Sequence, residues 1–239
     1  MAARRNIGIP LLLLAALGVT YLWVSAQDLD SMEARVLNAS FIRDATVSHL
    51  LLTAVAAALV VVIAIPLGVL LTRPFARLLT PVVMGVANVG QAAPALGVMV
   101  LLSILFGIGT KIAIVTLVFS AALPVLRNTI VGIQQVDPAL LEAGRGMGMS
   151  RGQILRRLEL PLAVPIVMAG LRTTIVICVG IATVATFINA GGLGDIIVAG
   201  IKLQRTPILV TGGVLTAVIA LGLDWLAGLA EKYVRPHGI

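Results

Sequence analysis

Charged residues are scarce in this sequence. Only 11% of its residues are Asp, Glu, Lys or Arg, whereas about a quarter are charged in an average soluble domain. Hydrophobic residues make up 59%, and the mean hydropathy is +1.11. This composition excludes an ordinary soluble domain and indicates an integral membrane protein.

Groups that could carry out chemistry are also few. Cys178 stands alone within an apolar run, and the two histidines, His49 and His237, lie far apart in the chain. We therefore expect no metal site and no enzyme activity. A Gly-x-x-x-x-Gly-Lys-Ser/Thr phosphate loop is missing as well, since Gly107 to Lys111 has the wrong spacing. No cofactor is expected on this chain, and any ATP and Mg must be bound by another one.

What the sequence does contain is long apolar runs, most of them near the roughly 20 residues that a spanning helix needs. Six can be drawn: Ile7–Ser25, Leu50–Leu71, Val82–Phe106, Ile112–Leu126, Ala163–Ile188 and Ile208–Ala230. They predict an all-α polytopic bundle of about six transmembrane helices. The first run also has features of a signal peptide with a small-residue cleavage site. We favour a retained helix because the apolar stretch is long for a signal peptide.

The basic residues give the orientation. With the N-terminus inside, eleven fall on inner segments and five on outer ones, which is a positive-inside bias. The inner set is Arg4, Arg5, Arg73, Arg77, Arg127, Arg145, Arg151, Arg156, Arg157, Lys232 and Arg235, and the outer set is Arg35, Arg43, Lys111, Lys202 and Arg205. Both termini are thus expected in the cytoplasm of a prokaryote, at its plasma (inner) membrane. Scattered over short loops, these residues do not favour a nucleic-acid partner.

A polar connector at residues 137–161 is expected on the cytoplasmic side. Asp137 followed by proline predicts a helix start. Three glycines end the short helix in a turn, for which Gly148 is one candidate for a left-handed conformation. Ser150 and Gln153 have the spacing of a capping box that opens a second helix, which Pro161 is expected to close. The connector therefore predicts a helix–turn–helix on the membrane surface.

The spacing of this connector is Glu142-Ala143-Gly144, three residues, Gly148, nine residues, Leu158, one residue, Leu160-Pro161. It resembles the EAA loop of ATP-binding-cassette (ABC) importer permeases, with Gly144 for the second Ala and Leu158 for Ile. The segments Gly170–Thr174, Gly180–Thr183 and Ala190–Ile201 look like the fifth span and outer loop of osmoprotectant permeases, which serve glycine betaine, choline and carnitine.

The resemblance implies a type I ABC importer transmembrane domain with several partners. These are an ABC ATPase subunit beneath the EAA helices, a second permease subunit, either identical or related, an extracytoplasmic solute-binding protein, and membrane lipid. The residues expected to couple to the ATPase are Leu140, Leu141, Glu142, Ala143, Gly144, Arg145, Met147, Gly148 and Arg151. Glu142 is expected to contact the ATPase; the alternative is a solvated carboxylate that balances Arg145 at i+3.

Polar residues within the runs are the candidates for a translocation path: Asn88, Gln91, Arg172, Thr183, Thr186 and Asn189. Arg172 and Asp224 are the charged residues in the later runs; a long Arg172 side chain can also snorkel to the inner surface. The expected organisation is an N-terminal span (1–26), an external segment (27–49), a permease core (50–230) and a cytoplasmic tail (231–239). A permease for an amino acid such as methionine and a small secondary transporter remain alternative functions.

Overall fold

The computed structural model describes residues 2–234, and it describes the side chains from residue 8 onward. All the regular structure in this part of the chain is helical, as expected. The helices in chain order are α1 (Ala2–Ser25), α2 (Ser31–Val36), α3 (Ala39–Leu71), η1 (Pro74–Ala76), α4 (Thr80–Ala92), α5 (Ala95–Phe106), α6 (Thr110–Gln134), α7 (Pro138–Gly146), α8 (Arg151–Ile154), η2 (Leu155–Glu159), α9 (Leu160–Ala182), η3 (Thr183–Ile188), α10 (Gly194–Leu203) and α11 (Thr206–Val234). Part of the predicted tail, 235–239 with Arg235 and His237, lies outside the described residues.

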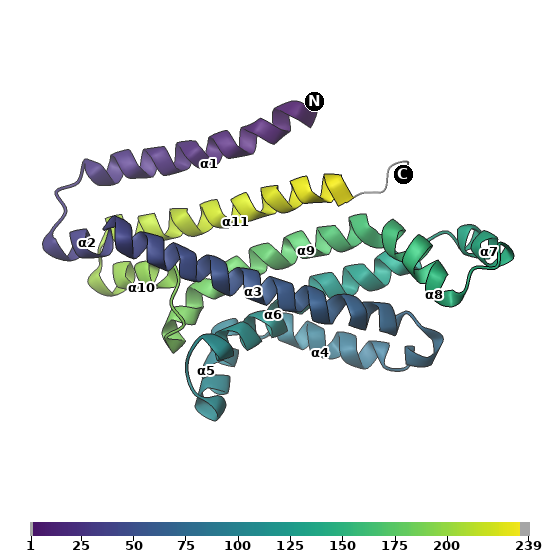
Figure 1. Cartoon of the computed structure of the whole chain (residues 1–239). Helices are drawn as coiled ribbons and strands as arrows, with labels where there is room; N and C mark the ends of the chain where they lie inside the picture. The colour runs from purple at the N-terminus through teal and green to yellow at the C-terminus, as the bar shows by residue number, and fades with distance from the viewer. Residues whose placement is uncertain (1, 235–239) are drawn as a thin grey trace.

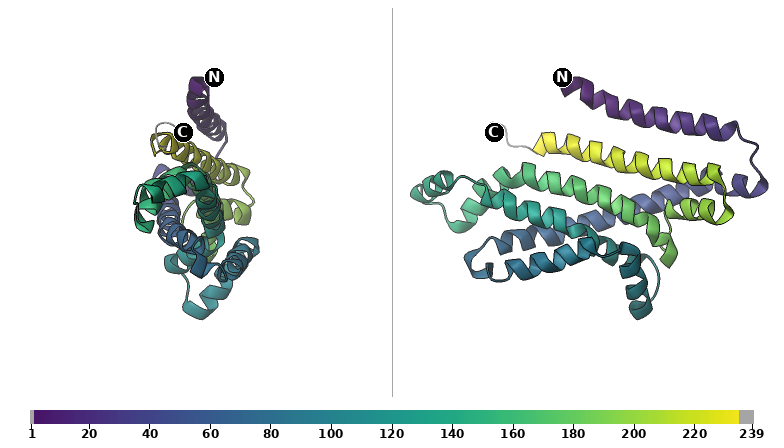
Figure 2. Two further views of the ribbon diagram at one scale, coloured as in Figure 1. Left: turned by 90° about the vertical axis from the view of Figure 1, so that its right-hand side faces the viewer. Right: turned by 180° about the vertical axis from the view of Figure 1, so that it is seen from behind.

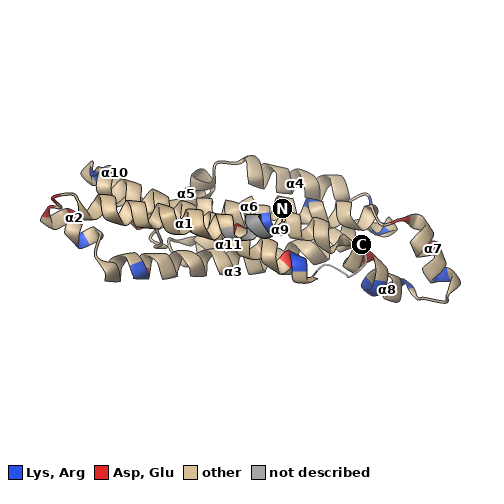
Figure 3. Cartoon of the chain, turned by 90° about the horizontal axis from the view of Figure 1, so that it is seen from above, with Lys and Arg blue, Asp and Glu red and all other residues tan. Residues whose placement is uncertain are grey.

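Five of the described helices are long and apolar enough to span a membrane, and the bent pair α4 and α5 raises the number to six. The long helices lie roughly side by side, with α7 and α8 at one end and α2 and α10 at the other (Figures 1 and 2). The start of α1 and the end of α11 both lie toward the α7 and α8 end. Charged residues gather mostly at these two ends, and the length between them is mostly uncharged (Figure 3).

The predicted span Val82–Phe106 is not one straight helix. It breaks between α4 and α5, which meet at 101°. Pro94 explains the break, because proline has no N–H for a helical bond and disfavours helical backbone in the residue before it. Ala93 accordingly has an extended ψ of 138°. The predicted span therefore becomes either a broken span or a re-entrant segment.

Other predicted limits differ from the structure at helix ends. The short run Ile112–Leu126 lies inside the longer α6, which extends to Gln134 and carries an exposed Arg127 near its end. The run Ala163–Ile188 is α-helical only to Ala182 and continues as the 3₁₀ helix η3. The segment expected outside, 27–49, contains α2 and the beginning of α3, whose Asn38 cap accepts the Phe41 amide at 2.8 Å.

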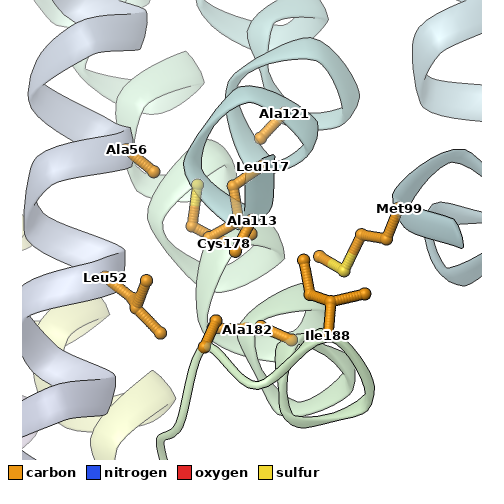
Figure 4. Close-up of a cluster of buried hydrophobic side chains, with 11 residues drawn as sticks. Leu52, Ala56, Met99, Ala113, Leu117, Ala121, Cys178, Ala182 and Ile188 are labelled. Atoms are coloured by element: carbon orange, nitrogen blue, oxygen red, sulfur yellow. The ribbon is translucent and has the colours of Figure 1, made fainter. Parts of the chain in front are cut away.

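Small side chains let the central helices approach one another. Ala56, Ala113, Ala121 and Ala182, from α3, α6 and α9, are all fully buried in one apolar cluster (Figure 4). Packing of small residues is the usual way in which membrane helices associate, because lipid supplies no hydrophobic driving force. Met99 of α5 reaches into the same cluster, so the bent segment is anchored to the core.

The helix α1 lies at the edge of the bundle, where it packs against α11 (Figures 1 and 2). From residue 8 onward, Leu13 is the only large side chain of α1 that is buried, and Leu11, Leu12 and Leu14 are exposed. Such a helix is covered mainly by lipid if it stays in the membrane. Its retention remains a prediction.

Candidate functional site

The connector between α6 and α9 has the helix–turn–helix form that its sequence predicts. Asp137 caps α7 by accepting the Ala139 amide at 2.8 Å, and Pro138 occupies the first turn. A proline is tolerated there because its missing N–H would have no partner in the helix. We call the segment from Asp137 to Glu159 the coupling hairpin.

The turn of the coupling hairpin is a complete Schellman motif. The Met149 amide donates to the Gly144 carbonyl at 3.0 Å, and the Gly148 amide donates to the Arg145 carbonyl at 2.9 Å. Gly148 has a φ of +78°, the left-handed conformation that this motif requires. The prediction that one of the glycines takes this conformation is therefore confirmed.

The second helix of the hairpin opens with the predicted capping box. The Ser150 amide donates to Gln153 Oε1 at 2.8 Å, and the Gln153 amide donates to Ser150 Oγ at 3.3 Å. The prediction that Pro161 ends this helix is wrong. The chain continues from α8 through a π-helical turn, η2, into α9.

The π-helical turn explains how the helix continues past Pro161. In this wide turn the Leu160 amide donates to the Leu155 carbonyl, five residues earlier. The register changes just before the proline, which then sits in the first turn of α9. As a result, the second helix of the hairpin and the membrane helix α9 form one continuous element.

Gly144 lies where the two helices of the hairpin touch. A β-carbon at this position would be 2.9 Å from Leu158 Cδ1 and 3.3 Å from Met149 Sδ. This contact explains why a residue without a side chain suits the position where the EAA pattern has alanine. The buried Ile154 packs on the same inner side of the hairpin.

Most of the residues predicted to couple are exposed on the hairpin. Leu140 is 47% exposed and Met147 72%, although both are apolar; Leu141 is half-buried. The others on the surface are Glu142, Ala143, Arg145, Gly148 and Arg151. Among the described ion pairs, none joins Glu142 to Arg145, so the i+3 pair is not formed. The hairpin thus presents apolar and charged groups to the outside of the protomer.

An ion pair that the sequence analysis missed ties the base of the hairpin to the rest of the bundle. Arg73, in the turn after α3, donates to Glu159 at the end of η2 at 2.6 Å and 3.4 Å. The two residues are far apart in the sequence, so spacing gives no sign of the contact. The only available signal is Glu159 itself, a carboxylate between Leu158 and Leu160.

The candidate path residues fall into two groups. Asn88 and Gln91 are exposed on α4, one helical turn apart. Thr183, Thr186 and Asn189 belong to η3 and its cap. The helix η3 packs against α5, α6, α9 and α10, whereas α4 packs mainly on α6. A single protomer therefore does not bring all the candidates into one site.

Arg172 is held in an ion-paired cluster. Its Nε and Nη2 donate to the two Asp224 oxygens at 2.9 Å and 2.8 Å, and its Nη1 lies 3.5 Å from Glu231. The guanidinium also packs on Gly228, where an added β-carbon would lie 3.3 Å from Arg172 Cζ. The positive charge of Arg172 on α9 is thus compensated by acidic residues of α11. If Arg172 lines the translocation path, Asp224 and Glu231 must lie beside the path as well.

The segment between η3 and α10 lies at the end of the bundle opposite α7 and α8 (Figure 1). Gly191 and Gly192 have φ angles of +76° and +102°, positive values that favour glycine and let the chain turn sharply. The Leu193 amide donates to Nδ1 of the buried His49 at 3.3 Å. Thr186 donates to Asp195, the second residue of α10. This segment is therefore fastened to α3 and η3.

A second link at the same end of the bundle joins α2 to the loop between α10 and α11. Arg205 donates to Asp30 at 2.6 Å, and Asp30 caps α2 by accepting the Glu33 amide at 2.8 Å. The Glu33 amide, with a further contribution from Arg205, holds the pKa of the Asp30 carboxyl below its usual value. The pair keeps its charge at neutral pH and fixes the short helix α2 against the core.

A family model and the similar relatives in this comparison all describe membrane components of transport systems. Residues 64–236 match the family model described as "Binding-protein-dependent transport system inner membrane component". The carnitine transport permease protein OpuCD of Listeria monocytogenes is 41% identical over 200 residues, which cover 83% of this chain and 89% of the relative. The choline transport system permease protein OpuBB of Bacillus subtilis is 40% identical over 194 residues, 81% of this chain and 88% of the relative.

Among solved structures, an inward-facing conformation of the MetNI methionine ABC transporter is similar. Its matched chain has a TM-score of 0.71 and 25% identity, and the match covers 81% of this chain and 96% of that chain. The likeness supports the type I ABC importer transmembrane fold that the EAA resemblance implies.

Proposed function

Because the chain belongs to the family of binding-protein-dependent transport system inner membrane components, we propose that it is the permease subunit of an ABC importer for a quaternary-amine osmoprotectant such as glycine betaine, choline or carnitine. The relatives named for carnitine and choline support this substrate class, since both solutes carry a trimethylammonium group. The methionine transporter shares the fold, so methionine is the substrate to test as the alternative.

The observation that carries the proposal is the coupling hairpin. Leu140 on α7 and Met147 at its end are exposed, and α7 lies at one end of the bundle, beyond the long helices (Figure 1). Apolar side chains at such a position fit a protein partner. Since the hairpin continues into α9 as one element, a partner that displaces the hairpin would also displace a membrane helix.

In this proposal the partner is a separate ATPase, because the chain has no phosphate loop of its own. Leu140, Leu141 and Met147 pack into the ATPase, and Glu142, Arg145 and Arg151 supply polar contacts around them. ATP and Mg are bound by that partner. A solute-binding protein on the outer side delivers the substrate.

The exposed polar face of α4 supports a second permease subunit. Asn88 and Gln91 are exposed on α4, which together with α5 is apolar enough to form a broken span or a re-entrant segment. Polar amides are costly against lipid hydrocarbon, so this face should meet water or another protein. We infer that two permease subunits enclose the path, with Asn88 and Gln91 on its wall and Thr183, Thr186 and Asn189 nearer its outer end.

The first prediction concerns substrate binding. Binding sites for quaternary ammonium groups usually surround the cation with aromatic rings, but this chain has only two Trp, two Tyr and five Phe. Tyr21 and Tyr233 are largely exposed near helix ends, where interfacial anchoring accounts for them. We expect calorimetry on the purified permease to detect no saturable binding of choline or glycine betaine.

The complete importer serves as the control for this experiment. Reconstituted with its ATPase and binding protein, it should import a quaternary amine and should not import methionine. Micromolar binding to the permease alone that is lost in Asn88→Ala or Gln91→Ala would contradict a passage without a binding site. Uptake that survives ATP depletion and stops when the ion gradient collapses would instead favour a secondary transporter.

The second prediction concerns orientation. Gln135, between α6 and α7, and Lys202, in the last turn of α10, are both exposed. The helices α7 and α10 lie at opposite ends of the bundle (Figure 1), so single cysteines at these positions test the orientation. In a Cys178→Ala background, a membrane-impermeant thiol reagent should label Lys202→Cys from outside intact cells, and Gln135→Cys only after the cells are opened. Labelling of both positions from outside would contradict a cytoplasmic coupling hairpin.

A further inference from the structure

The ion pair between Arg73 and Glu159 joins two segments that both lead into moving parts of the proposed importer. Glu159 is the last residue of the π-helical turn η2, between the coupling hairpin and α9. Arg73 stands in the turn between α3 and α4. The contact therefore connects the hairpin with the helix that carries Asn88 and Gln91.

The Glu159 carboxylate is nearly buried and is held by Arg73 in one orientation. The Glu159 side chain is only 10% exposed, and Arg73 is the only partner that its carboxylate has among the described hydrogen bonds and ion pairs. Nη2 of Arg73 is 2.6 Å from Oε2, and Nη1 is 3.4 Å from Oε1. A carboxylate taken out of water needs such a partner, and a two-pronged guanidinium holds it in one orientation.

The Arg73 side chain is itself held in place from the α3 side. Its Nε donates to the Val69 carbonyl at 3.2 Å and to Thr72 Oγ1 at 3.1 Å. The Thr72 hydroxyl in turn donates to the same carbonyl at 2.7 Å. The guanidinium is thus fixed to the end of α3, and a pull on Glu159 would be passed directly to the α3–α4 turn.

The π-helical turn is the place where the continuous α8–α9 element can deform. Such turns depart from regular helical hydrogen bonding, are rare, and often occur at functional sites. Without a fixed point beside it, the turn would absorb a displacement of the hairpin as local bending. Arg73 supplies a fixed point at its last residue.

We propose that Arg73 and Glu159 are positioning residues for coupling: their ion pair makes the base of α9 and the α3–α4 turn move together, so that a displacement of the coupling hairpin reaches the polar face of α4. This inference rests on the proposed function. It assigns the pair a role in converting ATP hydrolysis into transport, and it separates that role from docking of the ATPase, which belongs to the exposed tip of the hairpin.

The experiment compares variants in the reconstituted importer with its ATPase and binding protein. The variants are Glu159→Gln, Arg73→Gln and the charge exchange Arg73→Glu with Glu159→Arg. Arg77→Gln is the matched control, because Arg77 is an exposed arginine in the same turn. Three quantities are measured: co-purification of the ATPase, the ATPase rate with binding protein, and the number of solute molecules imported per ATP hydrolysed.

The two single variants should keep the ATPase bound and active but should lower the number of solutes imported per ATP about fivefold. The charge exchange should recover part of that loss, because it restores the ion pair but not the bond from residue 73 to the Val69 carbonyl. Arg77→Gln should match the unaltered importer. An unchanged ratio in Glu159→Gln would overturn the inference. So would a proportional loss of ATPase rate and uptake that the charge exchange does not recover, since this indicates a purely structural contact.

If Glu159→Gln does not yield folded permease, Arg73→Lys provides the test. Lysine keeps the charge but cannot form the two-pronged contact together with the bond to the Val69 carbonyl. A lowered import ratio at a normal ATPase rate supports the inference, and a normal ratio overturns it. Failure of the proposed function would look different, because the unaltered chain would then not bind the ATPase or import any quaternary amine.

Discussion

Gly148→Leu is expected to lower ATP-driven uptake by about tenfold or more, because it should disrupt the turn of the coupling hairpin. Gly148 has a φ of +78°, and for an L-residue with a side chain the left-handed conformation costs roughly 1–2 kcal/mol. Space is not the obstacle, since a β-carbon at this position would have nothing within 4 Å. The turn should therefore rearrange, and the Schellman bonds to Gly144 and Arg145 should be lost.

Two further variants separate conformation from side-chain size. Gly148→Asn should retain most of the uptake, because asparagine tolerates the left-handed conformation better than other residues with a side chain. Gly146→Leu adds the same side chain inside α7, where a β-carbon is also free of neighbours. Uptake and ATPase co-purification are measured for all three. Equal results for Gly148→Leu and Gly148→Asn would show that the turn conformation is not what matters.

The coupling hairpin could be predicted in detail because its determinants are local. A capping aspartate, a capping box and a glycine at a helix end each act within a few residues. Asp137 and Ser150 could therefore be assigned from spacing alone, whereas the turn residue could be narrowed only to Gly144, Gly146 or Gly148. Pro161 was interpreted by the same local rule, and that prediction failed. The π-helical turn changes the hydrogen-bond register just before the proline, and no pattern in the sequence predicts such a turn.

Contacts between distant segments could not be predicted. Arg172 and Asp224 each stood out as a charge within an apolar run, but their pairing depends on how α9 and α11 lie together. The pairs of Arg73 with Glu159 and of Arg205 with Asp30 are even harder to predict from the sequence. All four residues lie near span ends, where charged residues are common. Hydropathy locates the spans, whereas these pairs depend on how the helices pack against one another.

The break at Pro94 could be predicted only in part from the sequence. A proline within an apolar run is a visible signal, but transmembrane helices also contain prolines without breaking. Pro66 of α3 and Pro124 of α6 lie inside continuous helices of this same chain. What distinguishes Pro94 is the extended conformation of Ala93 before it, and this is a property of the folded chain.

Gly194→Ala should destabilise the folded permease by about 3 kcal/mol, the upper part of the range for overpacking a well-packed site. A β-carbon at Gly194 would be 1.9 Å from the Thr183 carbonyl oxygen and 2.8 Å from its carbon. Backbone atoms cannot rotate away as a side-chain end can. The start of α10 would have to move off η3, which would disturb the contact of Asp195 with Thr186 and the Leu193 bond to His49.

Gly213→Ala is the matched control for this substitution, because Gly213 is also helical, on α11, and a β-carbon there has nothing within 4 Å. Alanine favours a helix over glycine, so this variant should be as stable as the unaltered protein or slightly more so. The measurement is the fraction of purified permease that remains monodisperse after heating in detergent, followed over a temperature series. If Gly194→Ala matched Gly213→Ala, the close approach of α10 to η3 would not be a feature of the folded protein, and the segment between η3 and α10 would not be fastened by it.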